Sequence, residues 1–242
     1  MNLNNLLRGL KPKVGTNSQD LREIWLEKTL SDIPEGSRIL DAGAGTQRYR
    51  SYCSHLRYVS QDFGQYNVSG DGVGLHSDQF DYGELDIVSD IVDIPEETNS
   101  FDAVMCVEVL EHLPHPDRAI KEFGRLLRPG GMLVITAPFC SLTHMAPYHF
   151  CSGFSRYWFE RQLSDYDFEI LGIYPNGNYF EYLAQEVYRI PSISKRYSHD
   201  RPRIWEWISM ILVQKMLSRF SSRDEGSSEV LCYGFHVVAV KS

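Results

Sequence analysis

The sequence has few cysteines, and they are not arranged as a disulfide framework or a zinc site. The five cysteines are scattered and odd in number, and no two form a Cys-x-x-Cys motif; they stand at positions 53, 106, 140, 151 and 232. This usage is typical of a reducing compartment. We therefore expect a cytoplasmic protein without structural disulfides or zinc.

A surplus of positive charge is also missing. The 24 Lys and Arg residues are outnumbered by 32 Asp and Glu residues, which gives a formal net charge of −8. Nonspecific nucleic-acid binding depends on an excess of basic residues, so we expect no nucleic-acid partner. No apolar run approaches the roughly 20 residues of a membrane-spanning helix. Residues 1–13 are polar and interrupted, unlike a signal peptide.

The dinucleotide-binding fingerprint G-x-G-x-x-G lacks its last small residue. A β-type run ends at Asp41 and is followed by Gly43 and Gly45, but Arg48 stands at the third glycine position. Two glycines still let a ligand approach the main chain at the end of a strand. An acid there would repel a pyrophosphate and pair with an ammonium group. A nicotinamide oxidoreductase is therefore disfavoured.

A second acid follows the next β-type run. Asp62 ends the segment Leu56–Asp62 and stands 21 residues after Asp41, close to the roughly 20-residue offset of a ribose-binding carboxylate. A carboxylate at this place can accept hydrogen bonds from both ribose hydroxyls. The two strand ends together predict a site for a nucleoside that carries an amino acid.

Five motifs in this order resemble the class I S-adenosylmethionine-dependent methyltransferases, in particular the broad group called type 11. The resemblance runs from about Arg38 to Phe139. One departure is Gln47, where many relatives have a third glycine. The motifs are Leu40–Gly45, Val59–Asp62, Asp90–Pro95, Ser100–Leu113 and Leu126–Pro138.

The resemblance implies S-adenosylmethionine as the cofactor and assigns residues to its amino-acid end. Asp41 lies near the methionine ammonium, through the backbone or water. Cys106 and Val107 offer their carbonyls to the same end. Three residues form a close main-chain floor: Gly43, Ala44 and Gly45.

The resemblance also assigns residues to the nucleoside. Asp62 takes the ribose hydroxyls, and Phe63 lies beside the adenine. Asp90 accepts from the exocyclic amine of the adenine, and the main chain of Ile91 reads the ring edge. Two nearby acids are alternatives for the role of Asp90: Asp86 and Asp93.

Strand-like and helix-like segments alternate along the chain, which predicts an α/β fold. We expect a doubly wound, Rossmann-like sheet of seven strands, mostly parallel, with an antiparallel last strand. Residues 1–242 form a single domain in this interpretation, with an N-terminal helical segment over 1–34. Helices are expected at 18–31 and 116–127, and strands at 38–42, 57–61, 86–90, 101–107, 132–138, 169–174 and 234–240.

Two regions depart from this plan. Residues 63–84 are rich in glycine, and we interpret them as an extended loop beside the ribose or as a plain surface excursion. Residues 176–228 form a helical insertion before the last strand, with a helix expected at 204–220. Between Arg189 and Arg223, eight Lys or Arg residues stand against two acids. The insertion is interpreted as a lid or a homodimer contact, and peripheral membrane contact through 203–220 is a third alternative.

Glu108, Glu111 and His112 are spaced i, i+3, i+4, so on a helix start they would share one face. This pattern is similar to that of metal-assisted O-methyltransferases of the ubiquinone-biosynthesis and small-RNA types. The Glu-His-Leu sequence is also frequent in relatives with no known metal, where the histidine orients a substrate or caps the helix. We expect no metal, and count His112 among the candidate catalytic residues.

The loop after the fifth strand carries His144 and His149, followed by the aromatic run Phe154–Phe159. Histidine commonly removes a hydroxyl proton near neutral pH, so both are candidate catalytic bases. Similar loops occur in methyltransferases of bacterial surface-polysaccharide gene clusters. We therefore expect O-methylation of a sugar, glycolipid or other small molecule. The alternatives are a nicotinamide-dependent oxidoreductase and a noncatalytic binding protein that keeps the fold.

Overall fold

The computed structural model describes residues 14–66, 75 and 81–242. Most of the glycine-rich stretch expected as a loop, and the first part of the N-terminal segment, lie outside these residues. The chain divides into two compact units, one of Arg22–Tyr174 with Gly234–Ser242 and one of Met1–Leu21 with Pro175–Tyr233. The single domain expected over 1–242 stays a prediction.

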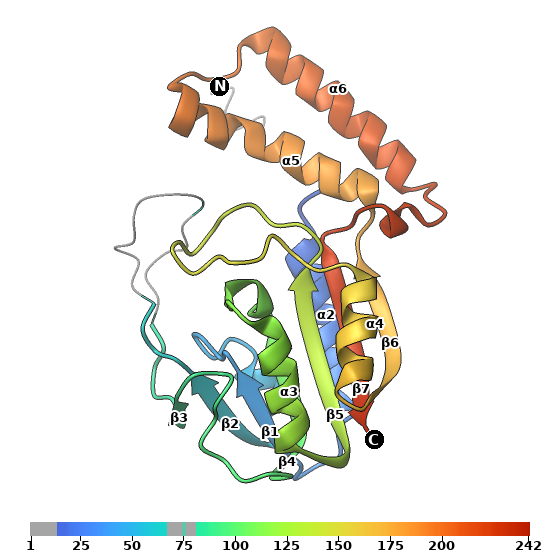
Figure 1. Ribbon diagram of the computed structural model, residues 1–242. Helices are drawn as coiled ribbons and strands as arrows, with labels where there is room; N and C mark the ends of the chain where they lie inside the picture. The colour runs from blue at the N-terminus through green and yellow to red at the C-terminus, as the bar shows by residue number, and fades with distance from the viewer. Residues whose placement is uncertain (1–13, 67–74, 76–80) are drawn as a thin grey trace. The chain divides into compact units, whose positions relative to one another are not determined.

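The larger unit is built on a seven-stranded sheet with the order β3-β2-β1-β4-β5-β7-β6 (Figure 1). Neighbouring strands from β3 to β5 pair in parallel, and β7 runs antiparallel to β5. This topology confirms the predicted fold class. The strands are β1 (Arg38–Ala42), β2 (Arg57–Asp62), β3 (Ile87–Val88), β4 (Phe101–Val107), β5 (Leu127–Pro138), β6 (Phe168–Asn176) and β7 (Gly234–Lys241).

Three α-helices accompany this sheet: α2 (Ser18–Ser31), α3 (Pro116–Leu126) and α4 (Arg156–Asp165). The first two were expected from their spacing of apolar residues. α4 was not expected, because its aromatic residues were interpreted as part of a loop. Ser155 caps α4 by accepting a hydrogen bond from the Trp158 N–H, and the helix buries Phe159 and Leu163.

Alternation along the strands sends apolar side chains to both faces of the sheet. Leu26 and Leu30 of α2 pack in one cluster with Ile39, Met105 and Val134. The residues between these on the same strands point to the opposite face, which α3 covers (Figure 1). Both faces are therefore buried, and the exposed functional groups lie where the strands end.

The smaller unit contains two helices, α5 (Tyr179–Ile193) and α6 (Ile204–Ser221), joined through a π-helical turn, η3 (Ser194–Ser198). Asn178 caps α5 by accepting from the Glu181 N–H. The Gln214 side-chain amide donates to the Ala184 carbonyl at 2.6 Å and ties α6 to α5. The helix expected at 204–220 is thus present. Its role as a lid or dimer contact stays a prediction.

His236 on β7 is buried and stacks on Trp25, with ring centroids 4.6 Å apart. Burial lowers the pKa of His236 to about 4 from its ordinary value near 6.5, and the Arg22 cation lowers it further. Between these two pH values the unfolded chain binds a proton that the folded chain does not. Stability is therefore lost as the pH falls from 6.5 to 4.

We expect His236→Phe, which keeps the stack on Trp25, to lose less stability than the natural chain on acidification. The difference should reach up to about 3 kcal/mol between pH 6.5 and 4, measured by urea unfolding. His115→Phe, at an exposed position, is the control. Equal losses in all three proteins would contradict the assignment.

Candidate active site

The first part of the site is the glycine turn after β1. Gly43 has φ +77°, and a Cβ there would lie 2.5 Å from a methyl carbon of Val109. The N–H groups of Gly43 and Ala44 both donate to the Gln61 carbonyl, at 2.9 and 2.8 Å. The turn is thus fixed against the end of β2 and admits only glycine at position 43.

Asp62 holds this turn in place. Its buried carboxylate accepts from the Gly45 N–H at 2.9 Å and from the Gly64 N–H at 3.0 Å. Each oxygen keeps a further lone pair, which leaves acceptor capacity for ribose hydroxyls. The sequence suggested the ribose role for Asp62, but it did not suggest that this residue also orders the glycine turn.

Gln47 fills the position where relatives have a third glycine, and it adopts a glycine-like φ of +55°. Its side-chain amide donates to the carbonyls of Tyr82 and Glu84, at 3.0 and 2.7 Å. These two hydrogen bonds hold Gln47 in its left-handed backbone conformation. Gln47 thus adopts a backbone conformation that is open to glycine as well.

Asp41 is a buried acid at the end of β1. The Tyr58 hydroxyl donates to its carboxylate at 2.5 Å. Burial raises the pKa of Asp41 to about 7, and the nearby Asp62 raises it further, while Tyr58 opposes the change. A ligand that brings an ammonium group would compensate this buried charge.

Asp86 and Asp90, two of the acids considered for the adenine amine, are both exposed beside β3. Asp86 accepts from both the N–H and the hydroxyl of Ser60, each at 2.8 Å, and these bonds lower its pKa. Asp90 is exposed after β3, beside the buried Ile91. The Asp90 carboxylate in turn accepts from the Val92 N–H at 3.1 Å, and its role toward the adenine amine stays a prediction.

The end of β4 leads into the acidic residues. Cys106 is buried and Val107 pairs with Thr136, so the carbonyls that are predicted to accept hydrogen bonds from the ligand lie at the carboxyl end of β4. Glu108 follows with φ +55°. Its carboxylate pairs with Arg22 at 3.0 Å and accepts from the Thr136 hydroxyl at 2.9 Å.

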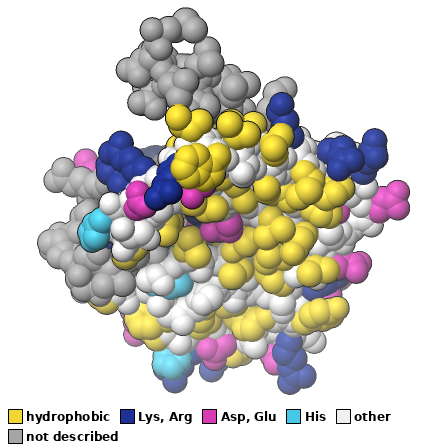
Figure 2. All heavy atoms as spheres, turned by 90° about the horizontal axis from the view of Figure 1, so that it is seen from above, with side chains coloured by type: hydrophobic (Ala, Val, Ile, Leu, Met, Phe, Trp, Pro, Cys, Tyr) yellow, Lys and Arg dark blue, Asp and Glu magenta, His cyan; other side chains and the backbone are white. Residues whose placement is uncertain are grey.

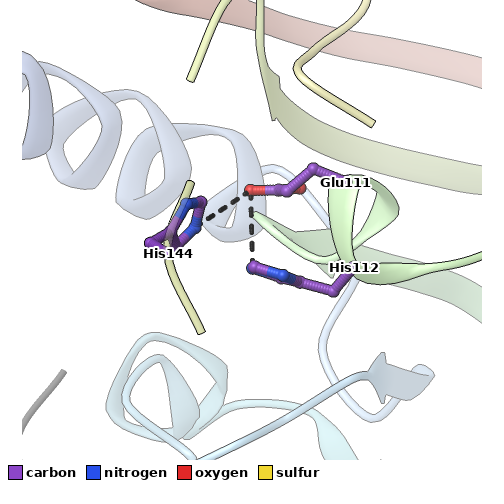
Figure 3. A group of neighbouring side chains, drawn as sticks. All are labelled: Glu111, His112 and His144. Carbon is purple, nitrogen blue, oxygen red and sulfur yellow. Dashed lines mark ion pairs between the residues drawn. The ribbon is translucent and has the colours of Figure 1, made fainter. Parts of the chain in front are cut away.

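This arrangement corrects the expectation that Glu108, Glu111 and His112 share one helix face. The helical turn that begins here is a 3-10 turn, η2 (Leu110–His112), and it starts after Glu108. The carboxylate of Glu108 is held by Arg22. The residue that joins Glu111 and His112 is His144, from the loop after β5 (Figure 3).

Glu111, His112 and His144 offer three ligand atoms within 4.8 Å of one another. The Nε2 atoms of His112 and His144 lie 3.8 and 4.0 Å from Oε1 of Glu111. Both imidazoles direct this nitrogen at the same carboxyl oxygen, as Figure 3 shows. We call these three residues, together with the neighbouring His149, the histidine cluster.

Backbone carbonyls fix the tautomers in the histidine cluster. The Nδ1 of His112 lies 2.5 Å from the Tyr148 carbonyl, and the Nδ1 of His144 lies 2.9 Å from the Leu142 carbonyl. A carbonyl only accepts, so each Nδ1 carries the proton in the neutral ring. Each Nε2 therefore presents a free lone pair to Glu111.

Burial favours the uncharged forms of Glu111 and His112. Burial is the main cause that lowers the pKa of His112 to about 4, and the neighbouring His144 contributes to the same shift. Burial is the main cause that raises the pKa of Glu111 well above its usual range, and the nearby Glu108 carboxylate raises it further. Oε2 of Glu111 is buried and has no hydrogen-bond partner among the described residues. Two nitrogen lone pairs and an uncompensated carboxyl form a donor set that fits a divalent cation.

His149 completes the cluster. Its ring centroid lies 5.0 Å from that of His144, and its Nε2 lies 3.1 Å from the Ser141 hydroxyl. The same loop reaches the cofactor side, where Tyr148 packs edge-on against Phe63 with centroids 5.2 Å apart. The structure thus brings all three candidate bases together. Their catalytic roles stay predictions.

Comparison with known proteins places residues 40–135 in a family described as "Methyltransferase domain". The chain is 33% identical over 110 residues to the tRNA (carboxymethyluridine(34)-5-O)-methyltransferase of Arabidopsis thaliana, which covers 44% of this chain and 25% of that protein. It is 37% identical over 105 residues to the ubiquinone biosynthesis O-methyltransferase of Xanthomonas oryzae, which covers 42% and 43%. The chain thus spans less than half the length of these curated relatives.

Among solved structures, the chain is similar to Haemonchus contortus phosphoethanolamine N-methyltransferase 2 in complex with S-adenosyl-L-methionine. The TM-score is 0.52 at 16% identity, and the match covers 91% of this chain and 52% of that one. At this identity the likeness concerns the fold. The three proteins carry different acceptors in their names, so the shared fold does not define the acceptor.

Asp41 gives a test of the buried charge. Its raised pKa means that the folded protein loses stability as the pH rises from about 4 to 7, because the buried carboxyl must ionise. We expect Asp41→Asn to stabilise the ligand-free protein at pH 8, by up to about 4 kcal/mol. The same change should weaken S-adenosylhomocysteine binding at least about tenfold, since the ammonium loses its partner.

Tyr58→Phe is the matched control for this experiment. It removes the hydroxyl that stabilises the ionised Asp41, so it should destabilise the protein at pH 8. Thermal unfolding over a pH series and calorimetric titration measure both effects. An Asp41→Asn variant that is less stable at pH 8 and binds normally would show that this carboxyl is structural.

Proposed function

We propose that this chain, whose residues 40–135 form a class I S-adenosylmethionine-dependent methyltransferase domain, transfers a methyl group to an oxygen of a small acceptor. The match confirms the predicted family and its cofactor. Sugars and glycolipids are the acceptor class that we favour. The observation that carries the proposal is the histidine cluster at the carboxyl ends of β4 and β5, because these are the strand ends next to the glycine turn.

In the proposed reaction the acceptor oxygen attacks the methyl carbon of the sulfonium in line with the carbon–sulfur bond. The bond electrons go to sulfur, and S-adenosylhomocysteine is released. In a metal-free form of this reaction the hydroxyl proton passes to an Nε2 lone pair of His112 or His144, both of which have the tautomer needed to accept it. The protein otherwise positions the two partners and excludes water.

One observation supports oxygen as the acceptor atom, and a second supports a sugar as the acceptor class. Both curated relatives carry an O-methyltransferase activity in their names. The loop after β5 and the start of α4 also present exposed aromatic rings, of which Phe150 and Tyr157 are 51% and 73% exposed. Aromatic faces suit the apolar faces of sugar rings, and ligand sites commonly combine such surfaces with a few polar groups.

The donor set of the cluster favours a metal-assisted form of this reaction. Glu111, His112 and His144 would hold a divalent ion, which would lower the pKa of an acceptor hydroxyl. From the sequence alone we expected no metal, because the Glu-His-Leu sequence is also frequent in relatives with no known metal, and Glu108 was the third residue of the ligand set considered there. The structure offers His144 in its place, and the uncompensated carboxyl of Glu111 fits a cation.

Ligand-induced stabilisation tests the cofactor class. We expect S-adenosylhomocysteine to raise the melting temperature in a concentration-dependent way, and NADH to leave it unchanged, because only a bound ligand stabilises the folded state. Stabilisation by NADH alone would favour the oxidoreductase. Binding of S-adenosylhomocysteine without methyl transfer to any glycan or glycolipid fraction would favour a noncatalytic protein.

Removal of divalent ions tests the cluster. We expect EDTA to abolish methyl transfer and Mg²⁺ or Mn²⁺ to restore it. His144→Ala should lower turnover at least about tenfold and leave the affinity for S-adenosylhomocysteine unchanged, since a group that acts on the acceptor affects only turnover. His199→Ala, an exposed histidine in the other unit, is the control. Full turnover in EDTA would contradict the metal-assisted form of the reaction. A neutral histidine of the cluster would then be the base that accepts the proton.

A further inference from the structure

α6 is apolar around most of its circumference, and little of it is covered. Only Gln214 and Leu217 of its 18 residues are buried. A helix that is hydrophobic all round normally lies inside a protein or against another apolar phase. The large apolar side chains exposed along it are Ile204, Trp205, Trp207, Ile208, Leu212, Val213, Met216 and Phe220.

The surface of the smaller unit extends this apolar face. Figure 2 shows hydrophobic side chains gathered over the helices seen from above, with Lys and Arg side chains at the margin. Tyr188 and Tyr197, on α5 and the π-helical turn, are 52% and 57% exposed. Tyr and Trp are the residues that favour the boundary between water and lipid.

The charges beside α6 are almost all positive. Between positions 189 and 223 there are eight Lys or Arg residues and two acids, a local +6 in a chain of net −8. The basic residues flank the apolar stretch on both sides: Lys195, Arg196, Arg201 and Arg203 precede it, and Lys215, Arg219 and Arg223 follow or end it. No acid occurs from Trp207 to Ser222.

We propose that the α5–α6 hairpin binds the surface of a membrane that contains anionic phospholipid, with α6 lying parallel to it. Trp205, Ile208 and Leu212 are spaced i, i+3 and i+7, so they share one face that can enter the headgroup boundary. The flanking cations then reach the phosphates. Among the described residues no helix is long and apolar enough to span the membrane, so the contact is with the surface.

Charge argues against a second copy of this chain on the same face. In a two-fold dimer the same patch meets itself. Such a contact through α6 would bring the basic residues of one copy toward those of the other, and between positions 189 and 223 they outnumber the acids by eight to two. Like charges that face one another across an interface are costly. An anionic lipid surface removes that repulsion.

Vesicle flotation with the full chain tests this proposal. We expect the chain to float with phosphatidylcholine vesicles that contain about 30% phosphatidylglycerol, and not with phosphatidylcholine alone. Binding should fall in about 0.5 M salt, because the charges are screened. Trp emission should shift to the blue on binding, because rings from α6 leave water.

Two double variants make the test specific. Ile208→Glu with Leu212→Glu should lower the bound fraction at least about tenfold, because two acids then face the lipid. Val88→Glu with Leu171→Glu, at positions 66% and 53% exposed in the other unit, should bind like the natural chain. Circular dichroism and melting temperature establish that each variant is folded.

Three outcomes would overturn the proposal: no flotation with anionic vesicles, equal flotation with neutral vesicles, or equal loss in both double variants. Light scattering measures the oligomeric state and so tests the alternative that the apolar face is a dimer contact. A dimer that the α6 variant dissociates, without any vesicle binding, would assign the apolar face to self-association. The readout does not involve methyl transfer, so its failure leaves the proposed activity intact.

Discussion

The site depends on the two hydrogen bonds that the Asp62 carboxylate accepts from the N–H groups of Gly45 and Gly64. They join the turn after β1 to the residues after β2. The turn has glycine at position 43 because Val109 leaves no room for a Cβ. The main chain of this turn is therefore held in one conformation and is also accessible to a ligand. A ligand that contains a nucleoside requires both properties. The sheet supplies the rest by bringing parallel strand ends to one edge.

Two buried acids lie at this edge, Asp41 and Glu111. Burial raises the pKa of Asp41 to about 7, and it raises that of Glu111 well above its usual range. A carboxyl group in such surroundings is costly unless a cation or a proton accompanies it. The ammonium of the cofactor suits the first acid, and a divalent ion held with two imidazoles suits the second.

The smaller unit has a different physical character. Most of the chain is acidic, whereas the α5–α6 hairpin is basic and exposes a continuous apolar face. If acceptors are lipid-linked, a hairpin that binds anionic lipid would hold the enzyme where they are concentrated, and the two proposals would then describe one task.

The sequence by itself predicted the fold class and the positions of several strands, whereas the cofactor-binding residues that it suggested stay predictions. β1 and β4 were predicted at the residues where they occur, because buried parallel strands are short apolar runs that end at acids and glycines. It could not determine that His144 faces Glu111, since the two come from different loops after different strands. It also suggested Glu108 as a ligand, and only the fold shows that Arg22 from α2 takes that carboxylate. Local patterns set local structure, whereas contacts between distant segments depend on how the sheet brings its strand ends together.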